Sequence, residues 1–221
     1  MTDPNRTHIT AILDCSGSMA ELTSDTIGGF NKYKNEQKAL PGSVTFTLIL
    51  FNEESKVVHN AVDLKDVPDL TSKVYEAGGW TAMNDALAEG IQSTGESLAA
   101  KPEEERPGLV IVLAMTDGLE NSSKKYPGPK GTSAIREMVK HQTEKYNWSF
   151  VFMGANIDAK KVGGDLGVDG TCSMNYIADS AGVGESYKEL SKGTQSLRKR
   201  TSKGQAKGDF FEDPNKVIGK P

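Results

Sequence analysis

Short apolar segments rich in β-branched residues alternate with segments of helical periodicity, and this alternation restricts the fold more than any other feature. The apolar segments cover residues 8–14, 43–51, 109–115 and 148–153, with a weaker one at 171–176. Segments with helical spacing cover residues 23–40, 81–99, 131–146, 158–166 and 180–200. Strands that alternate with helices form a parallel sheet whose two faces are both covered by helices.

One pair of strands departs from this alternation. A polar turn at residues 52–55 separates the strand at 43–51 from another at 56–62, and this spacing predicts a hairpin. The segment 109–115 is the most apolar and should lie at the centre of the sheet. We therefore predict a Rossmann-like, doubly wound α/β fold. Its sheet has six strands and is mostly parallel, with residues 56–62 as the single antiparallel edge strand.

Length and composition are typical of one globular domain. The chain has 221 residues, of which 36% are hydrophobic and 25% are charged. We assign residues 1–200 to this domain and residues 201–221 to a flexible tail rich in Lys and Gly. Phe210 and Phe211 in that tail suggest an arm that docks on a neighbouring molecule. No apolar run reaches the ~18–20 residues of a membrane helix. No signal region begins the sequence, so we expect a cytoplasmic protein, or a virion component if a phage encodes it.

The charged and metal-binding residue types exclude several functions. The formal net charge is −4, which argues against nucleic-acid binding despite basic residues between 192 and 207. We interpret that basic cluster as a solvated helix face. The two cysteines match neither a disulfide framework nor a zinc motif, and three scattered histidines do not predict a transition-metal site. Cys15 is either a small buried side chain or a redox switch, and the first reading is favoured.

Oxygen-bearing side chains gather where two strands end and where one long helix begins. The first strand ends in Asp14-Cys15-Ser16-Gly17-Ser18, the central strand ends in Thr116-Asp117-Gly118, and Gly78-Gly79-Trp80-Thr81 precedes the helix. Ligands of such sheets bind at the carboxyl ends of the strands. Carboxylate and hydroxyl oxygens suit Mg²⁺, Mn²⁺ or Ca²⁺. The metal ligands we predict are Asp14, Ser16, Ser18, Thr81 and Asp117. Alternatively, Asp14 and Asp117 only cap their loops.

These motifs resemble the metal-ion-dependent adhesion site of von Willebrand factor A-type domains. DCSGS, Thr81 and TDG occur in the order and spacing of that family, and GGWTAMNDAL is similar to its stand-alone bacterial and phage members. The resemblance implies that Asp14 acts through water, that Ser16 and Ser18 are first-loop ligands, and that Thr81 is a second-loop ligand. It also implies that Asp117 acts directly or through water. One coordination position would then accept an Asp or Glu of a partner protein.

The motifs leave three functions to weigh. We expect a non-enzymatic, metal-dependent protein-binding module. A magnesium-dependent phosphohydrolase of the haloacid dehalogenase type is the enzymatic alternative, but Ser16 stands where such enzymes need a second Asp. The third function, a structural role in a phage particle or a multiprotein assembly, is compatible with the first.

Four further residues near the motifs are of interest, and three of them have two interpretations. Trp80 is either a partner contact or a lid packed on the helix. Asp85 fits the first turn of a helix, where an acidic residue is favoured by the helix dipole. Glu120 and Asn121 either tune the site indirectly or are simply solvated.

Overall fold

The computed structural model describes residues 2–218 and contains a six-stranded sheet in the order β3-β2-β1-β4-β5-β6. Its strands are β1 (Asp3–Asp14), β2 (Ser43–Phe51), β3 (Ser55–Asp63), β4 (Pro107–Thr116), β5 (Ser149–Gly154) and β6 (Ser173–Asn175). Only β3 runs antiparallel to its neighbour, and the remaining strand pairs are parallel. The predicted α/β fold, its six strands and its antiparallel edge strand are therefore confirmed.

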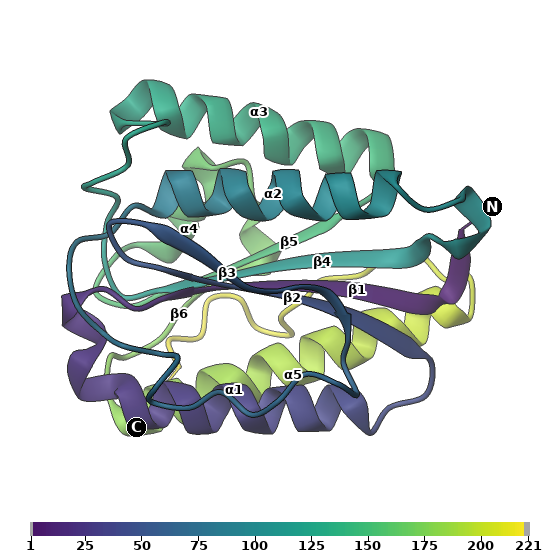
Figure 1. Cartoon of the computed structure of the whole chain (residues 1–221), viewed down its shortest axis with the longest axis horizontal. Helices are drawn as coiled ribbons and strands as arrows, with labels where there is room; N and C mark the ends of the chain where they lie inside the picture. The colour runs from purple at the N-terminus through teal and green to yellow at the C-terminus, as the bar shows by residue number, and fades with distance from the viewer. Residues whose placement is uncertain (1, 219–221) are drawn as a thin grey trace.

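Helices cover both faces of the sheet (Figure 1). On one face lie α1 (Thr23–Lys38) and α5 (Ser180–Ser202), and on the other lie α2 (Met83–Ala99), α3 (Gly128–Tyr146) and α4 (Ala159–Asp165). The short 3₁₀ helices η1 (Gly17–Leu22), η2 (Glu103–Glu105) and η3 (Gly170–Cys172) occupy connections between these elements. This arrangement gives the domain one hydrophobic core on each side of the sheet.

The central strands contribute to both cores because successive side chains of a strand point to opposite faces. Along β1, Ile9, Ala11 and Leu13 pack into the core beneath α1 and α5, whereas Ile12 packs into the core beneath α2. Ile9 and Ile12 are both fully buried. A strand covered on both sides has no solvent-facing positions, which explains why these segments are continuous apolar runs in the sequence.

Among the element boundaries that differ from the prediction, the starts of β1 and α2 bear on the position of the site. β1 begins at Asp3 and not near residue 8, because Asp3, at its polar N-terminal end, pairs with Pro107 at the start of β4. Helix α2 begins at Met83 and not at Thr81. Thr81 and Ala82 precede the helix, and their backbone N–H groups donate to the Asn121 side-chain oxygen and the Asn52 carbonyl.

A buried polar network interrupts the core between β1, β2 and α2. The His8 ring is fully buried, and its Nδ1 and Nε2 lie 2.8 Å and 3.1 Å from the hydroxyl oxygens of Thr45 and Thr10. The Thr10 hydroxyl in turn lies 2.6 Å from that of Thr94 on α2. Burial, with a smaller contribution from the charge of Lys101, lowers the pKa of His8 to about 3. His8 therefore remains neutral in the folded protein across the physiological range.

The segment after α5 returns to the domain. Phe210 and Phe211 are 3% and 1% exposed and belong to the core beneath α5, where Phe210 packs against Gly193. Ile218 forms a parallel bridge with Tyr176. The two phenylalanines are thus packed within their own chain, which corrects the docking arm inferred from the sequence. The predicted flexibility of residues 201–221 stays a prediction, and residues 219–221 lie outside the described residues.

Within residues 2–218, no helix combines the length and the apolar composition needed to cross a bilayer.

The buried neutral state of His8 predicts a specific pH dependence of stability. The unfolded chain binds a proton at His8 below its ordinary pKa of 6.5, whereas the folded protein does so only near pH 3. The contribution of His8 to the free energy of unfolding is therefore fully present above pH 6.5 and is lost as the pH falls towards 3. Between these pH values the free energy of unfolding changes by about 1.4 kcal/mol per pH unit.

The variant His8→Gln should lack this part of the slope when the free energy of unfolding is measured in urea between pH 4 and pH 7. His141→Gln, which changes an exposed histidine of α3, serves as the control and should keep the wild-type slope. Equal slopes for all three proteins would contradict the assignment.

Candidate metal centre

The parallel pairing of β1 with β4 brings the two predicted acidic ligands together. Leu13 pairs with Met115, so Asp14 ends β1 beside the end of β4 at Thr116. The Thr116 hydroxyl donates a hydrogen bond of 2.5 Å to Asp14 Oδ2. Asp117 follows directly in the chain. The two carboxylates thus lie at the same carboxyl edge of the sheet, as the sequence predicted.

The first loop (residues 15–18) brings the hydroxyls of Ser16 and Ser18 close to the two carboxylates. The Ser16 backbone N–H donates to Asp14 Oδ1 over 2.7 Å, which closes the turn after the strand. The Ser18 hydroxyl donates to Asp117 Oδ1 over 2.6 Å and lies 3.3 Å from the Ser16 hydroxyl. Four of the five predicted ligands are thereby joined in one chain of hydrogen bonds that links the ends of β1 and β4.

The second loop (residues 78–82) lies directly against the first. Gly17 N–H donates to the Gly79 carbonyl over 3.0 Å, and Gly78 N–H donates to the Cys15 carbonyl over 2.8 Å. Gly79 has a φ of +77°, and a Cβ added there would lie 2.2 Å from a carboxylate oxygen of Glu53. Gly17 of the first loop, by contrast, does not have a positive φ. The requirement for glycine therefore falls on the second loop.

The third loop (residues 117–121) holds Thr81 in place. Asn121 accepts the Thr81 N–H on its side-chain oxygen over 2.9 Å, and its own N–H donates to the Thr81 carbonyl over 3.0 Å. The Thr81 hydroxyl oxygen lies 3.6 Å from where a Cβ on Gly118 would be. Thr81, the fifth predicted ligand, is thus held beside the residue that follows Asp117. Asn121 supports the site and is not simply solvated.

Two further acidic side chains tie the third loop to the start of α2. Glu120 accepts hydrogen bonds from the N–H groups of Asn84, Ser122 and Ser123. Asp85 accepts the N–H groups of Lys124, Lys125 and Tyr126. We interpreted Asp85 only as a helix-dipole residue, and its three long-range bonds show that it also fixes the loop after the site.

Burial sets the electrostatics of the centre. Asp14 and Asp117 are 1% and 4% exposed, and none of the ion pairs within residues 2–218 includes either carboxylate. Burial raises the pKa of Asp14, hydrogen bonds from Thr116 and Ser16 oppose that rise, and the nearby Asp117 charge adds to it. Ser18, by contrast, is exposed and opens the centre to solvent.

The donor set fits a hard divalent cation. Two carboxylates and three hydroxyls supply only oxygen, which suits Mg²⁺, Mn²⁺ or Ca²⁺. Residues 2–218 contain no group of three or more His, Cys, Asp and Glu side chains arranged for a metal. That finding argues against a zinc-type site within this range. It does not address a site with only two carboxylates, in which hydroxyls complete the set.

Three residues that we had not assigned to the centre support it from behind. Thr116 bonds Asp14, as described above, and also accepts the Gly118 N–H over 3.2 Å. The Tyr75 hydroxyl donates to the Asp14 carbonyl, and the Tyr176 hydroxyl donates to the Thr116 carbonyl. Thr116 lies inside the motif and could have been found there. The tyrosines carry no local sequence signal because their contacts arise only from the tertiary fold.

The burial of the other candidate residues decides between their interpretations. Cys15 and Cys172 are free thiols, and Cys15 is 7% exposed, in agreement with a small buried side chain. Burial raises the pKa of Cys15 to about 12. Arg198 of the basic cluster is buried and donates to the Gln37 and Pro41 carbonyls, so it is not presented at the surface. Trp80 is 68% exposed and is therefore not a lid packed on α2.

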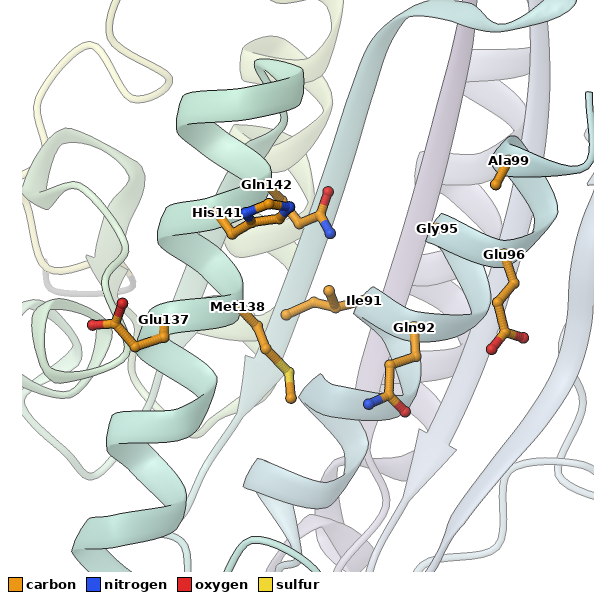
Figure 2. Close-up of a pocket in the computed structure, with 9 residues that line it drawn as sticks. All are labelled: Ile91, Gln92, Gly95, Glu96, Ala99, Glu137, Met138, His141 and Gln142. Atoms are coloured by element: carbon orange, nitrogen blue, oxygen red, sulfur yellow. The ribbon is translucent and has the colours of Figure 1, made fainter. Parts of the chain in front are cut away.

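One surface groove lies away from this centre. It has a volume of about 710 Å³ and runs between α2 and α3 (Figure 2). Ile91 and Met138 lie between the two helices, and Glu96 and His141 flank them. None of the five predicted ligands lines it, so the groove does not enlarge the candidate metal centre.

Comparison with known proteins identifies the fold. No protein-family model and no curated protein matches the sequence. Solved structures with a similar fold include a von Willebrand factor type A protein from Catenulispora acidiphila, with a TM-score of 0.54 and 18% identity over 90% of this chain. They also include the ArnB paralog VWA2 from Sulfolobus acidocaldarius, with a TM-score of 0.51 and 16% identity over 83% of this chain. A third is proximal thread matrix protein 1 from the mussel byssus, with a TM-score of 0.56 and 12% identity over 89% of this chain.

The chain thus has a von Willebrand factor A-type fold. It spans less than half of each of these structures, namely 42%, 44% and 46% of their lengths.

The bonds of Asp85 predict how the centre is stabilised. Asp85→Ala leaves the N–H groups of residues 124–126 without their acceptor, so we expect a loss of about 1–3 kcal/mol in the free energy of unfolding. Hydrogen exchange of those three amides should accelerate more than that of the amides in β4. Glu96→Ala, an exposed change on the same helix, is the control and should leave both measurements unchanged.

Proposed function

We propose that this chain, which has a von Willebrand factor A-type fold, is a non-enzymatic protein-binding module that depends on a divalent metal. The metal, Mg²⁺ or alternatively Mn²⁺ or Ca²⁺, would be held by Asp14, Ser16, Ser18, Thr81 and Asp117. The partner is a protein that offers an Asp or Glu side chain. One observation carries this proposal: two buried carboxylates, neither of which forms an ion pair within residues 2–218, are hydrogen-bonded to neighbouring serine and threonine hydroxyls.

Buried carboxylates need a compensating cation. An unpaired ionised group is costly to bury, and two such groups close together also repel each other. Within the described residues, the side chains that donate hydrogen bonds to these carboxylates are all hydroxyls, and a hydroxyl carries no positive charge. A bound divalent ion would supply that charge and one coordination position for a partner carboxylate. The exposure of Ser18 supports access from solvent on this side.

The contacts of Ser16 favour binding over catalysis. A phosphohydrolase with Asp14 as its nucleophile would need a proton-transferring carboxyl group at position 16. Here the Ser16 backbone closes the turn onto Asp14, and its hydroxyl lies 3.3 Å from another serine hydroxyl. Neither group has a pKa suited to general acid catalysis near neutral pH. We therefore retain the non-enzymatic function, with a role in a bacterial or phage assembly as its biological setting.

Calorimetry with Mg²⁺ tests the metal site directly. We expect wild-type protein to bind about one Mg²⁺, and saturating Mg²⁺ at about 100 times Kd should stabilise the fold by ~2.7 kcal/mol through mass action. Asp14→Ala should lose both the binding heat and the rise in thermal midpoint, because it removes a buried ligand.

Asp66→Ala, an exposed change in a turn, is the matched control and should behave like the wild type. Circular dichroism establishes that each variant is folded before its binding is measured. Equal Mg²⁺ binding by the wild type and Asp14→Ala would refute the site.

A phosphatase screen separates the binding module from the enzymatic alternative. With Mg²⁺ and a panel of phosphate monoesters, we expect hydrolysis no faster than in buffer alone. The reason is that position 16 holds a serine and not a carboxylic acid that could act as general acid. Turnover that disappears in Asp14→Asn would instead establish the phosphohydrolase.

A further inference from the structure

The two most exposed large apolar side chains lie on the loops of the candidate metal centre. Five large hydrophobic residues are exposed within residues 2–218, and Trp80 at 68% and Leu119 at 58% lead them. Trp80 directly precedes the predicted ligand Thr81, and Leu119 follows Asp117 by two positions. The other tryptophan, Trp148, is only 6% exposed. The exposure of Trp80 is therefore a local property of this edge of the sheet.

Hydrogen bonds hold the two segments that carry these apolar residues next to Thr81. The Thr81 N–H donates to the Asn121 side-chain oxygen, and the Asn121 N–H donates to the Thr81 carbonyl. These two bonds join the segment that carries Trp80 to the segment that carries Leu119. Gly118, next to Leu119, would place a Cβ 3.6 Å from the Thr81 hydroxyl. Trp80 and Leu119 therefore flank the Thr81 side of the centre, and we call this pair the apolar rim.

The backbone of the apolar rim is fixed although its side chains face solvent. The Trp80 N–H donates to Glu53 over 3.1 Å. On the other side, the Thr116 hydroxyl, which donates to Asp14, accepts the Gly118 N–H over 3.2 Å. A binding surface whose backbone is already ordered loses less conformational entropy when a partner arrives. Large, exposed aromatic side chains on such surfaces are frequent hot spots of protein–protein interfaces.

We propose that the apolar rim contacts an aromatic or large aliphatic side chain that lies within a few residues of the partner's metal-bound Asp or Glu. This inference rests on the proposed function and adds the partner's local sequence to it. The acidic side chain satisfies the charge of the cation, and the neighbouring apolar side chain covers Trp80 and Leu119. The partner motif is thus a carboxylate paired with an apolar residue.

The surroundings of the rim favour a protein segment over a lipid surface. Glu53 and Glu54 are exposed at the turn that holds Trp80, and Glu53 bonds its backbone. Apolar membrane-binding surfaces are usually accompanied by Lys and Arg that attract anionic headgroups. The acidic residues next to the apolar rim would instead repel anionic lipid headgroups.

Peptide selection on the full chain tests the apolar rim. A displayed library of random peptides is bound to immobilised protein in Mg²⁺ and eluted with EDTA. We expect the eluted peptides to carry Asp or Glu with a nearby aromatic or large aliphatic residue. The best synthetic peptide should bind the double variant Trp80→Ser/Leu119→Ser about tenfold or more weakly than the wild type.

Two controls make this result specific. Tyr146→Ser removes another exposed apolar side chain, 56% exposed at the end of α3, and should leave peptide binding unchanged. Magnesium calorimetry should give the same affinity for the double variant and the wild type, because neither rim residue is a predicted ligand. Replacing the peptide's apolar residue by Ser should weaken binding to the wild type but not to the double variant.

Three other outcomes overturn the inference, and they separate it from the proposed function. EDTA-eluted acidic peptides without apolar enrichment, bound equally by the double variant, remove the rim and leave the metal-dependent function standing. Peptides that depend on the rim but are not released by EDTA show that the rim binds apart from the metal. A wild-type protein that yields no EDTA-eluted acidic peptides contradicts both the proposed function and the rim.

Discussion

The parallel pairing of β1 with β4 is the interaction on which the candidate centre depends. It is the hydrophobic, two-sided burial of these strands that fixes their register, because a slip of one residue would turn every apolar side chain to the other face. The same register sets Asp14 beside Thr116. The geometry of the candidate centre is therefore set by the packing of the two cores against these strands.

Much of this arrangement could be predicted because its determinants are local in the sequence. Continuous apolar runs identify strands buried on both faces, and a parallel sheet sends the polar residues after those runs to one edge. Asp14, Ser16 and Ser18 fall in one short loop, so their convergence needs no knowledge of the tertiary structure. Asp117 follows from the end of the most apolar strand in the same way.

The parts that could not be predicted depend on contacts between distant segments. Asp85 has the sequence context of an ordinary first-turn acid, and only the fold places residues 124–126 against its carboxylate. Phe210 follows a Lys/Gly-rich stretch that is typical of a mobile tail, yet Gly193 of α5 leaves room for its ring. His8 begins an apolar run, and its ring bonds Thr10 of β1 and Thr45 of β2, while Thr10 in turn bonds Thr94 of α2. In each case the sequence shows one partner and the fold supplies the other.

The three loops of the centre differ in how they are held. The first and third loops continue directly from β1 and β4, so the sheet itself restrains them. The second loop continues from no strand and is positioned by hydrogen bonds to Gly17, Glu53 and Asn121. Individual hydrogen bonds contribute about 1 kcal/mol each, far less than a buried strand. Thr81 and the neighbouring Trp80 therefore owe their positions to these hydrogen bonds, whereas Asp14 and Asp117 owe theirs to the strands that precede them.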